Sequence, residues 1–159
     1  LMKQVNLELS EQLSDSGIDF RFQLPEKRVM LMLDSEKTYR IFENLLVNIA
    51  KYGMPGTRAY VEIQETEFSG EDGGRAVDGG ERRENRGEVK ISMKNISAAE
   101  LPKGAEELTG RFVRGDQSRN TEGSGLGLAI AKSFTELQKG SFQVETEADL
   151  FKVTIVWKK

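Results

Sequence analysis

Apolar residues recur at the spacing of an α-helix in three stretches of the chain. In the first stretch, Val5, Leu9 and Leu13 share one face, and Gly17 follows where a helix would end. Asp and Ser accept hydrogen bonds at helix N-termini, and Gly is common just beyond a helix. The spacing predicts helices from Val5 to Ser16, from a cap at Asp34 or Ser35 to Gly53, and from Leu126 to a stop at Gly140.

Elsewhere apolar and polar residues alternate, which is the pattern of a half-buried β-strand. The alternation covers six short stretches, at residues 18–24, 29–33, 60–64, 89–93, 142–145 and 151–157. Six strands interleaved with three helices predict an α+β two-layer sandwich. We expect a mixed, mostly antiparallel sheet of five to six strands with the three helices on one face, and a single domain over residues 1–159.

Two long connections interrupt this pattern. Residues 65–87 are rich in Gly, Glu and Arg and have almost nothing apolar to bury, so we expect a flexible hairpin insertion. The second connection, near residues 99–122, contains Pro102 and scattered glycines. A long loop inside a compact domain often carries function.

Composition narrows the chemistry. The formal net charge is only -3 with both signs mixed along the chain, so a nucleic-acid partner is disfavoured. There is no Cys and no His, which excludes thiolate metal sites, a Cys nucleophile and phosphohistidine chemistry within these residues. No run approaches the roughly 18 apolar residues that a membrane span needs. We therefore expect a soluble segment that makes no membrane contact of its own.

The second predicted helix presents Asn44, Asn48 and Lys51 on one face, within about 60° of one another. An Asn carbonyl oxygen is a neutral ligand for Mg²⁺, and Lys can neutralise phosphate oxygens. Any amphipathic helix exposes polar residues opposite its apolar stripe, so this face alone does not decide between a phosphate site and a solvated surface.

A glycine-rich turn runs straight into the third predicted helix, where free N–H groups and the helix dipole suit a phosphate. It is neither a Walker sequence nor a dinucleotide fingerprint, because no Lys-Ser/Thr pair follows the glycines and no strand precedes them. The turn comprises Gly123, Ser124, Gly125, Leu126, Gly127 and Leu128.

A third feature is the segment from Arg111 to Asp116, with Arg119 just beyond it. Arg114 and Arg119 can reach phosphates if the long connection folds over them. A solvated, charged loop is the alternative interpretation.

Taken in order, these three features closely resemble the catalytic domain of bacterial sensor histidine kinases. The helix around Asn44 to Tyr52 is similar to the family's N-box, Arg111-Phe112 to its F-box, and Gly123 to Leu128 to its second glycine box. That family shares the GHKL, or Bergerat, ATP-binding fold with gyrase and heat-shock ATPases. The resemblance runs from the first helix through the final strand, with residues 65–87 as an insertion.

The resemblance implies a Mg²⁺-ATP site between the N-box helix and a lid at residues 99–122. Asn48 would be the metal ligand, while Asn44 and Lys51 would serve the phosphates as catalytic residues. Tyr52 would pack near the adenine, and Phe112 would anchor the lid that carries Arg114 and Arg119. Backbone donors for the phosphates would come from Gly123, Ser124, Gly125, Leu126, Gly127 and Leu128.

One position departs from the family pattern. The first glycine box, normally D-x-G-x-G, appears here as Asn95-Ile96-Ser97-Ala98-Ala99. In the family the aspartate accepts a hydrogen bond from the adenine amino group, and an Asn carbonyl oxygen can do the same. We therefore expect Asn95 to bind adenine, at an affinity lowered by the loss of charge.

The implied function is transfer of the ATP γ-phosphate to a histidine on a separate dimerisation domain of the same parent protein, with a response regulator acting downstream. Such parents are usually membrane sensors whose catalytic domain lies in the cytoplasm. Two alternatives stay open. One is a degenerate domain that binds nucleotide weakly or serves as a regulatory surface, and the other is a different GHKL ATPase or an anti-sigma-type serine kinase.

Overall fold

A computed structural model describes residues 1–67, 87–101 and 126–159. Within these ranges four helices and five strands follow one another along the chain. They are α1 (Met2–Glu8), α2 (Ser10–Asp15), β1 (Asp19–Gln23), α3 (Ser35–Tyr52), β2 (Arg58–Glu67), β3 (Gly87–Ile96), α5 (Gly127–Leu137), β4 (Ser141–Glu147) and β5 (Leu150–Lys158).

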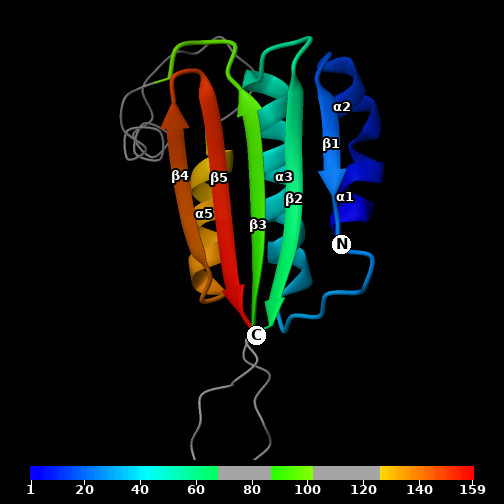
Figure 1. Cartoon of the computed structure of the whole chain (residues 1–159), viewed down its shortest axis with the longest axis vertical. Helices are drawn as coiled ribbons and strands as arrows, with labels where there is room; N and C mark the ends of the chain where they lie inside the picture. Colours follow the sequence, from blue (N-terminus) through cyan, green and yellow to red (C-terminus); the bar gives the residue numbers. More distant parts are fainter. Residues whose placement is uncertain (68–86, 102–125) are drawn as a thin grey trace, which may run out of the picture.

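The five strands form one mixed sheet in the order β1-β2-β3-β5-β4 (Figure 1). Strand β1 pairs with β2 in parallel, and the other neighbours are antiparallel. Strands β2 and β3 pair as far as Glu67 and Gly87, so residues 65–67 and 87 of the predicted insertion belong to the strands. Residues 68–86 of that insertion lie outside the described ranges.

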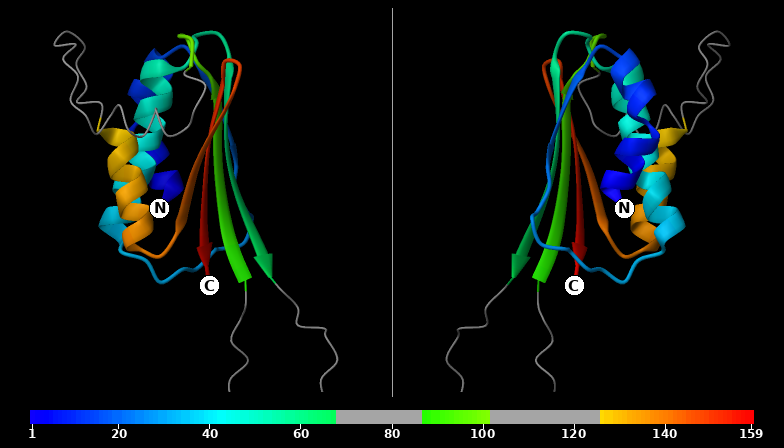
Figure 2. Two further views of the ribbon diagram at one scale, coloured as in Figure 1. Left: turned by 90° about the vertical axis from the view of Figure 1, so that its left-hand side faces the viewer. Right: turned by 90° about the vertical axis from the view of Figure 1, so that its right-hand side faces the viewer.

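All the described helices cover the same face of the sheet (Figure 2). This face carries the alternate residues that the sequence marks as apolar. On β5, for example, Phe151, Val153, Ile155 and Trp157 are buried against the helices. The predicted two-layer α+β sandwich is therefore confirmed. None of the described helices combines the length and the apolar character needed to cross a membrane.

Helix α3 follows the local signals closely. The Asp34 side chain accepts a hydrogen bond from the Lys37 N–H at 3.0 Å and so caps the N-terminus. At the other end the Gly53 N–H donates to the Ile49 carbonyl at 2.8 Å. Six side chains on the inner face are buried, namely Thr38, Ile41, Phe42, Leu45, Leu46 and Ile49.

The first predicted helix differs in detail. It begins at Met2 rather than Val5 and is broken at Leu9, whose φ of -93° and ψ of 4° are not helical, so that α1 and α2 are separate. The apolar spacing persists through the break because Val5 and Leu13 are both buried. Spacing alone therefore did not reveal the change of backbone conformation.

The predicted strand at residues 29–33 is wrong, because the structure shows no strand there. Val29, Leu31 and Leu33 are packed against the core, whereas Met30 and Met32 are 76% and 101% exposed. The alternation thus reflects an extended segment with one side on the core and no partner strand among the described residues. The described sheet has five strands, the lower of the predicted numbers.

Candidate functional site

The C-terminal end of α3 is fastened to the end of β3. The Met54 N–H donates to the Ile96 carbonyl at 2.8 Å, and the Ala98 N–H donates to the Tyr52 carbonyl at 2.9 Å. These hydrogen bonds hold the last turn of the helix beside the residues that follow the strand. The predicted N-box helix and the altered first glycine box therefore lie next to each other.

Gly53 lies at this junction in a space too small for a side chain. A Cβ atom at this position would lie 2.5 Å from Cδ1 of Ile18 and 2.6 Å from the Ile49 carbonyl oxygen. It would also lie 3.3 Å from Nδ2 of Asn95. Because real Cβ atoms do not tolerate contacts below about 3 Å, a side chain here would displace Ile18 or the last turn of α3.

A cavity of about 370 Å³ opens at this junction. Five predicted site residues line it: Asn48, Lys51 and Tyr52 from α3, Asn95 from β3 and Leu128 from α5. Six further residues line it, namely Ser97, Ala98, Ala99, Glu100, Leu101 and Phe151. The first five lie in the altered glycine box or at the start of the predicted lid, whereas sequence reasoning missed Phe151. Phe151 could have been found only with the strand register, which pairs it with Asn95.

Asn95 is the most informative of the lining side chains. It is only 4% exposed, and its Nδ2 donates to the Ile96 carbonyl at 3.1 Å. Its Oδ1 is buried and has no hydrogen-bond partner among the described residues. A buried polar atom without a partner costs free energy, of the order of 1–3 kcal/mol. Because Asn95 lines the cavity, a ligand whose N–H group reached this oxygen would satisfy it.

Asn44 lies against the start of α5 rather than in the cavity wall. Its Nδ2 donates to the Arg40 carbonyl at 2.8 Å. Its Oδ1 lies beside Gly127, where a Cβ atom would approach it to 3.1 Å. The structure thus brings the N-box helix into contact with the second glycine box at this point. Leu126 is 43% exposed and does not line the cavity.

The remaining predicted site residues fall outside the described ranges, as does residue range 102–122 of the predicted lid. These residues are Phe112, Arg114, Arg119, Gly123, Ser124 and Gly125.

Glu43, which neighbours Asn44 on α3, is engaged in an ion pair. The Arg40 guanidinium lies 2.6 Å from its carboxylate. The hydrogen bond and the charge of Glu43 raise the pKa of Arg40 above its ordinary value. The described residues contain no cluster of three His, Cys, Asp or Glu side chains that could hold a metal. A metal at this site would need the neutral oxygen of Asn48 together with ligands from a bound anion.

A larger hollow, of about 620 Å³, lies elsewhere, around Arg58, Tyr60 and Lys94 at the ends of β2 and β3. Of the predicted site residues that the structure describes, only Asn95 also borders it. Lys94 is paired there with Glu62 at 3.3 Å. The smaller cavity is the better candidate because four further predicted site residues line it besides Asn95, namely Asn48, Lys51, Tyr52 and Leu128.

Comparison with known proteins decides the family. The family model described as "Histidine kinase-, DNA gyrase B-, and HSP90-like ATPase" matches residues 33–158. The chain belongs to this ATPase family. Membership implies ATP binding, and the matched range includes α3, the cavity and α5.

Curated relatives of this ATPase domain are sensor proteins. The chain is 28% identical over 145 residues to the sensor histidine kinase YvrG of Bacillus subtilis, covering 90% of the chain and 22% of YvrG. It is 28% identical over 153 residues to the sensor protein VanSC of Enterococcus gallinarum, covering 92% of the chain and 36% of VanSC. The chain therefore spans about a fifth to a third of these relatives.

Solved structures have the same fold. The catalytic domain of histidine kinase ThkA matches with a TM-score of 0.68 at 18% identity, covering 99% of this chain and 90% of that one. The mycobacterial sensor histidine kinase MprB matches with a TM-score of 0.65 at 22% identity, covering 99% and 91%. The predicted resemblance to the catalytic domains of sensor histidine kinases is confirmed.

Proposed function

We propose that this ATPase domain binds Mg²⁺-ATP in the cavity between α3, β3 and α5 and transfers the γ-phosphate to a histidine of a separate dimerisation domain. The observation that carries the proposal is the cavity lined by Asn48, Lys51 and Tyr52, in which Asn95 keeps a buried acceptor without a partner. A match to ShkA, solved in complex with AMPPNP, supports it, with a TM-score of 0.65 at 18% identity over 98% of this chain.

The base would occupy the apolar part of the cavity. Leu101, Leu128 and Phe151 supply apolar surface there, and Tyr52 offers an aromatic ring at the rim. Asn95 Oδ1 would accept a hydrogen bond from the exocyclic amino group of adenine. This contact would remove the cost of the buried, unpartnered oxygen.

The phosphates would lie toward α5. Asn48 would offer its amide oxygen to Mg²⁺, and Lys51 would bind phosphate oxygens. Asn44 would act at the same end, where its side chain meets Gly127. The predicted contributions of Gly123, Ser124 and Gly125 would be backbone N–H groups at the start of α5, where the helix dipole favours an anion. Leu126 and Gly127 would extend that set.

The chain contains no histidine, so the acceptor must come from another polypeptide segment. The imidazole nitrogen would form a bond to the γ-phosphorus while the bond to the bridging oxygen breaks, and the imidazole would release its proton. Catalysis of this kind rests on positioning and on charge neutralisation. Nothing in this scheme needs Glu43 as a base, in keeping with its ion pair to Arg40.

The parent protein would be a longer sensor, because the curated relatives are sensor proteins of which the chain covers only a part. We expect it to reside at the cell membrane with this domain in the cytoplasm, and to supply the histidine domain and a response regulator as partners. A degenerate, regulatory domain is the second candidate, favoured by the loss of the acid and both glycines between Asn95 and Ala99.

Mixing this domain with the purified histidine-bearing domain of its parent and with γ-labelled ATP distinguishes these functions. We expect label on the partner that is acid-labile and alkali-stable, and no label when the acceptor histidine is replaced by Gln. Label that survives acid would indicate a serine kinase instead. Binding of ATP without any transfer would favour the regulatory domain.

A further inference from the structure

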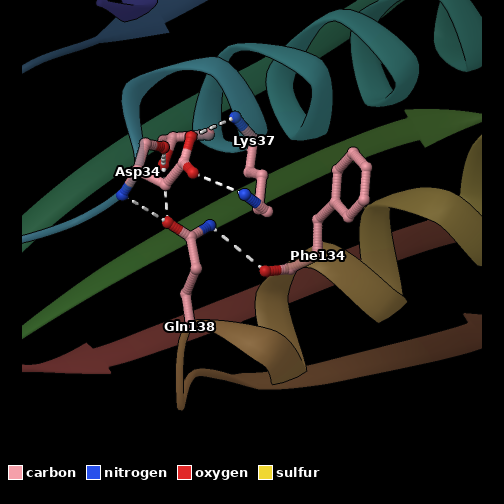
Figure 3. Close-up of polar contacts among 5 residues, drawn as sticks. Asp34, Lys37, Phe134 and Gln138 are labelled. Atoms are coloured by element: carbon pink, nitrogen blue, oxygen red, sulfur yellow. Dashed lines mark hydrogen bonds and ion pairs between the residues drawn. The ribbon is translucent and has the colours of Figure 1, made fainter.

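A single side chain at the end of α5 joins the two helices that carry the nucleotide motifs (Figure 3). Gln138 Oε1 accepts a hydrogen bond from the Asp34 N–H at 2.8 Å and a longer one, at 3.3 Å, from the Thr38 hydroxyl, which also donates to the Asp34 carbonyl at 2.7 Å. Gln138 Nε2 donates to the Phe134 carbonyl at 3.1 Å, which fixes the orientation of the amide. The side chain therefore ties the C-terminus of α5 to the N-terminus of α3.

The other end of the same helix pair lies at the site. There the Asn44 side chain of α3 meets Gly127, the first residue of α5. Gln138 lies eleven positions after Gly127, which corresponds to about 16 Å along the helix and a rotation of only about 20°. Asn44 lies ten positions after Asp34, which corresponds to about 15 Å. The two contacts thus lie at the two ends of one antiparallel interface.

Between these two contacts, the same side of α5 carries one small and one large residue. Ala131 lies about 40° from Gly127 and is fully buried, and Phe134 lies about 20° from Gly127 in the other direction and packs against the core. Gly and Ala allow close approach of two helices but form shallow ridges, so the packing near the site opposes a shift along the axis only weakly. The polar contacts at the two ends therefore add to the register that Phe134 provides.

We propose that Gln138 is a positioning residue for the nucleotide site. By holding the end of α5 to the cap of α3, it sets where Gly127 lies against Asn44 and how far Leu128 enters the cavity. The effect on nucleotide affinity rests on the proposed function, whereas the effect on the helix register does not. Replacing a residue that merely adds stability would change the melting temperature but leave the nucleotide affinity and the helix register unaltered.

The test compares Gln138→Ala with Gln143→Ala, which makes the same change on the exposed edge strand β4. In the ligand-free domain, well below the melting temperature, we expect Gln138→Ala to shift the NMR signals of the Leu128 methyls and the Asn44 amide. We also expect it to weaken ATP binding by about three- to tenfold. Gln143→Ala should change neither the signals nor the affinity.

Gln138→Glu provides a second comparison, because its carboxylate can still accept from Asp34 and Thr38 at the N-terminus of α3 but cannot donate to the Phe134 carbonyl. We expect it to return the Leu128 signals part of the way to their positions in the unaltered domain. If Gln138→Ala does not fold, Thr38→Val removes one donor to Oε1 and allows the same comparison with Gln143→Ala.

Unchanged Leu128 and Asn44 signals in a variant with a lowered melting temperature would overturn the proposal. Absence of ATP binding by the unaltered domain would instead overturn the proposed function, and the ligand-free signals would still decide the role of Gln138.

Discussion

Asn95 stands where the resemblance to the family leads us to expect an aspartate, and it is a buried polar residue of the cavity wall. The side chain is buried, and the Ile96 carbonyl holds its amide nitrogen, so that the amide oxygen is left as an acceptor without a partner among the described residues. A carboxamide can in principle present either a donor or an acceptor. The hydrogen bond to Ile96 favours the acceptor, and we therefore expect the site to select a base with an amino group.

Replacing Asn95 by Leu, which has nearly the same shape, should abolish this selection. The unaltered domain should bind ATP about tenfold more tightly than ITP, because the 6-oxo group of ITP would face Oδ1 with a second acceptor. Competition titrations with Asn95→Leu should give similar affinities for the two nucleotides. Thr154→Val is the matched control, because it removes a buried, unpartnered hydroxyl from the opposite face of the sheet. An unchanged ATP-to-ITP ratio in Asn95→Leu would refute the role of Asn95.

At the scale of elements, α3 positions the site because it packs on the core with one face and lines the cavity with other residues. Its two ends follow from local signals, with Asp34 as the N-cap and Gly53 after the last turn. Its inner face packs on the sheet, so the opposite face must carry Asn44, Asn48 and Lys51. Hydrogen bonds from the Lys37 ammonium and the Lys37 N–H lower the pKa of Asp34 below its ordinary value of 3.8.

This cap should make the stability of the domain depend on pH in the acid range. Because the pKa of Asp34 is lower in the folded state, its contribution is fully present above pH 3.8 and is lost as the pH falls through the lower, folded value. Thermal unfolding should show Asp34→Ala melting below the unaltered domain at neutral pH, with the difference shrinking in acid below pH 3.8. A difference that stays constant over this range would show that the Asp34 carboxylate does not contribute as a charged cap.

At the scale of the whole molecule, the fold could be predicted because it depends mainly on which face of each element is apolar. The prediction of a strand at residues 29–33 was wrong. The alternation there arises because Val29, Leu31 and Leu33 pack against the core from one side of an extended segment that is not part of the sheet. Sequence reasoning also missed Phe151 as a cavity residue and Gln138 as a bridge to Asp34, because both depend on contacts between segments far apart in sequence. Asn48 and Lys51 could be placed on one face from the spacing of a single helix, whereas Tyr52 was assigned through the resemblance to the family.

Calorimetric titration of the domain with ATP, with and without Mg²⁺, tests the central claim most directly, with Asn48→Ala measured alongside. We predict binding that Mg²⁺ strengthens, and a loss of about 10- to 100-fold in the Mg²⁺-dependent affinity of Asn48→Ala. Circular dichroism would verify that the variant is folded. No detectable binding up to about millimolar ATP, or an equal effect of Mg²⁺ on both proteins, would contradict the assignment of this cavity as the Mg²⁺-ATP site.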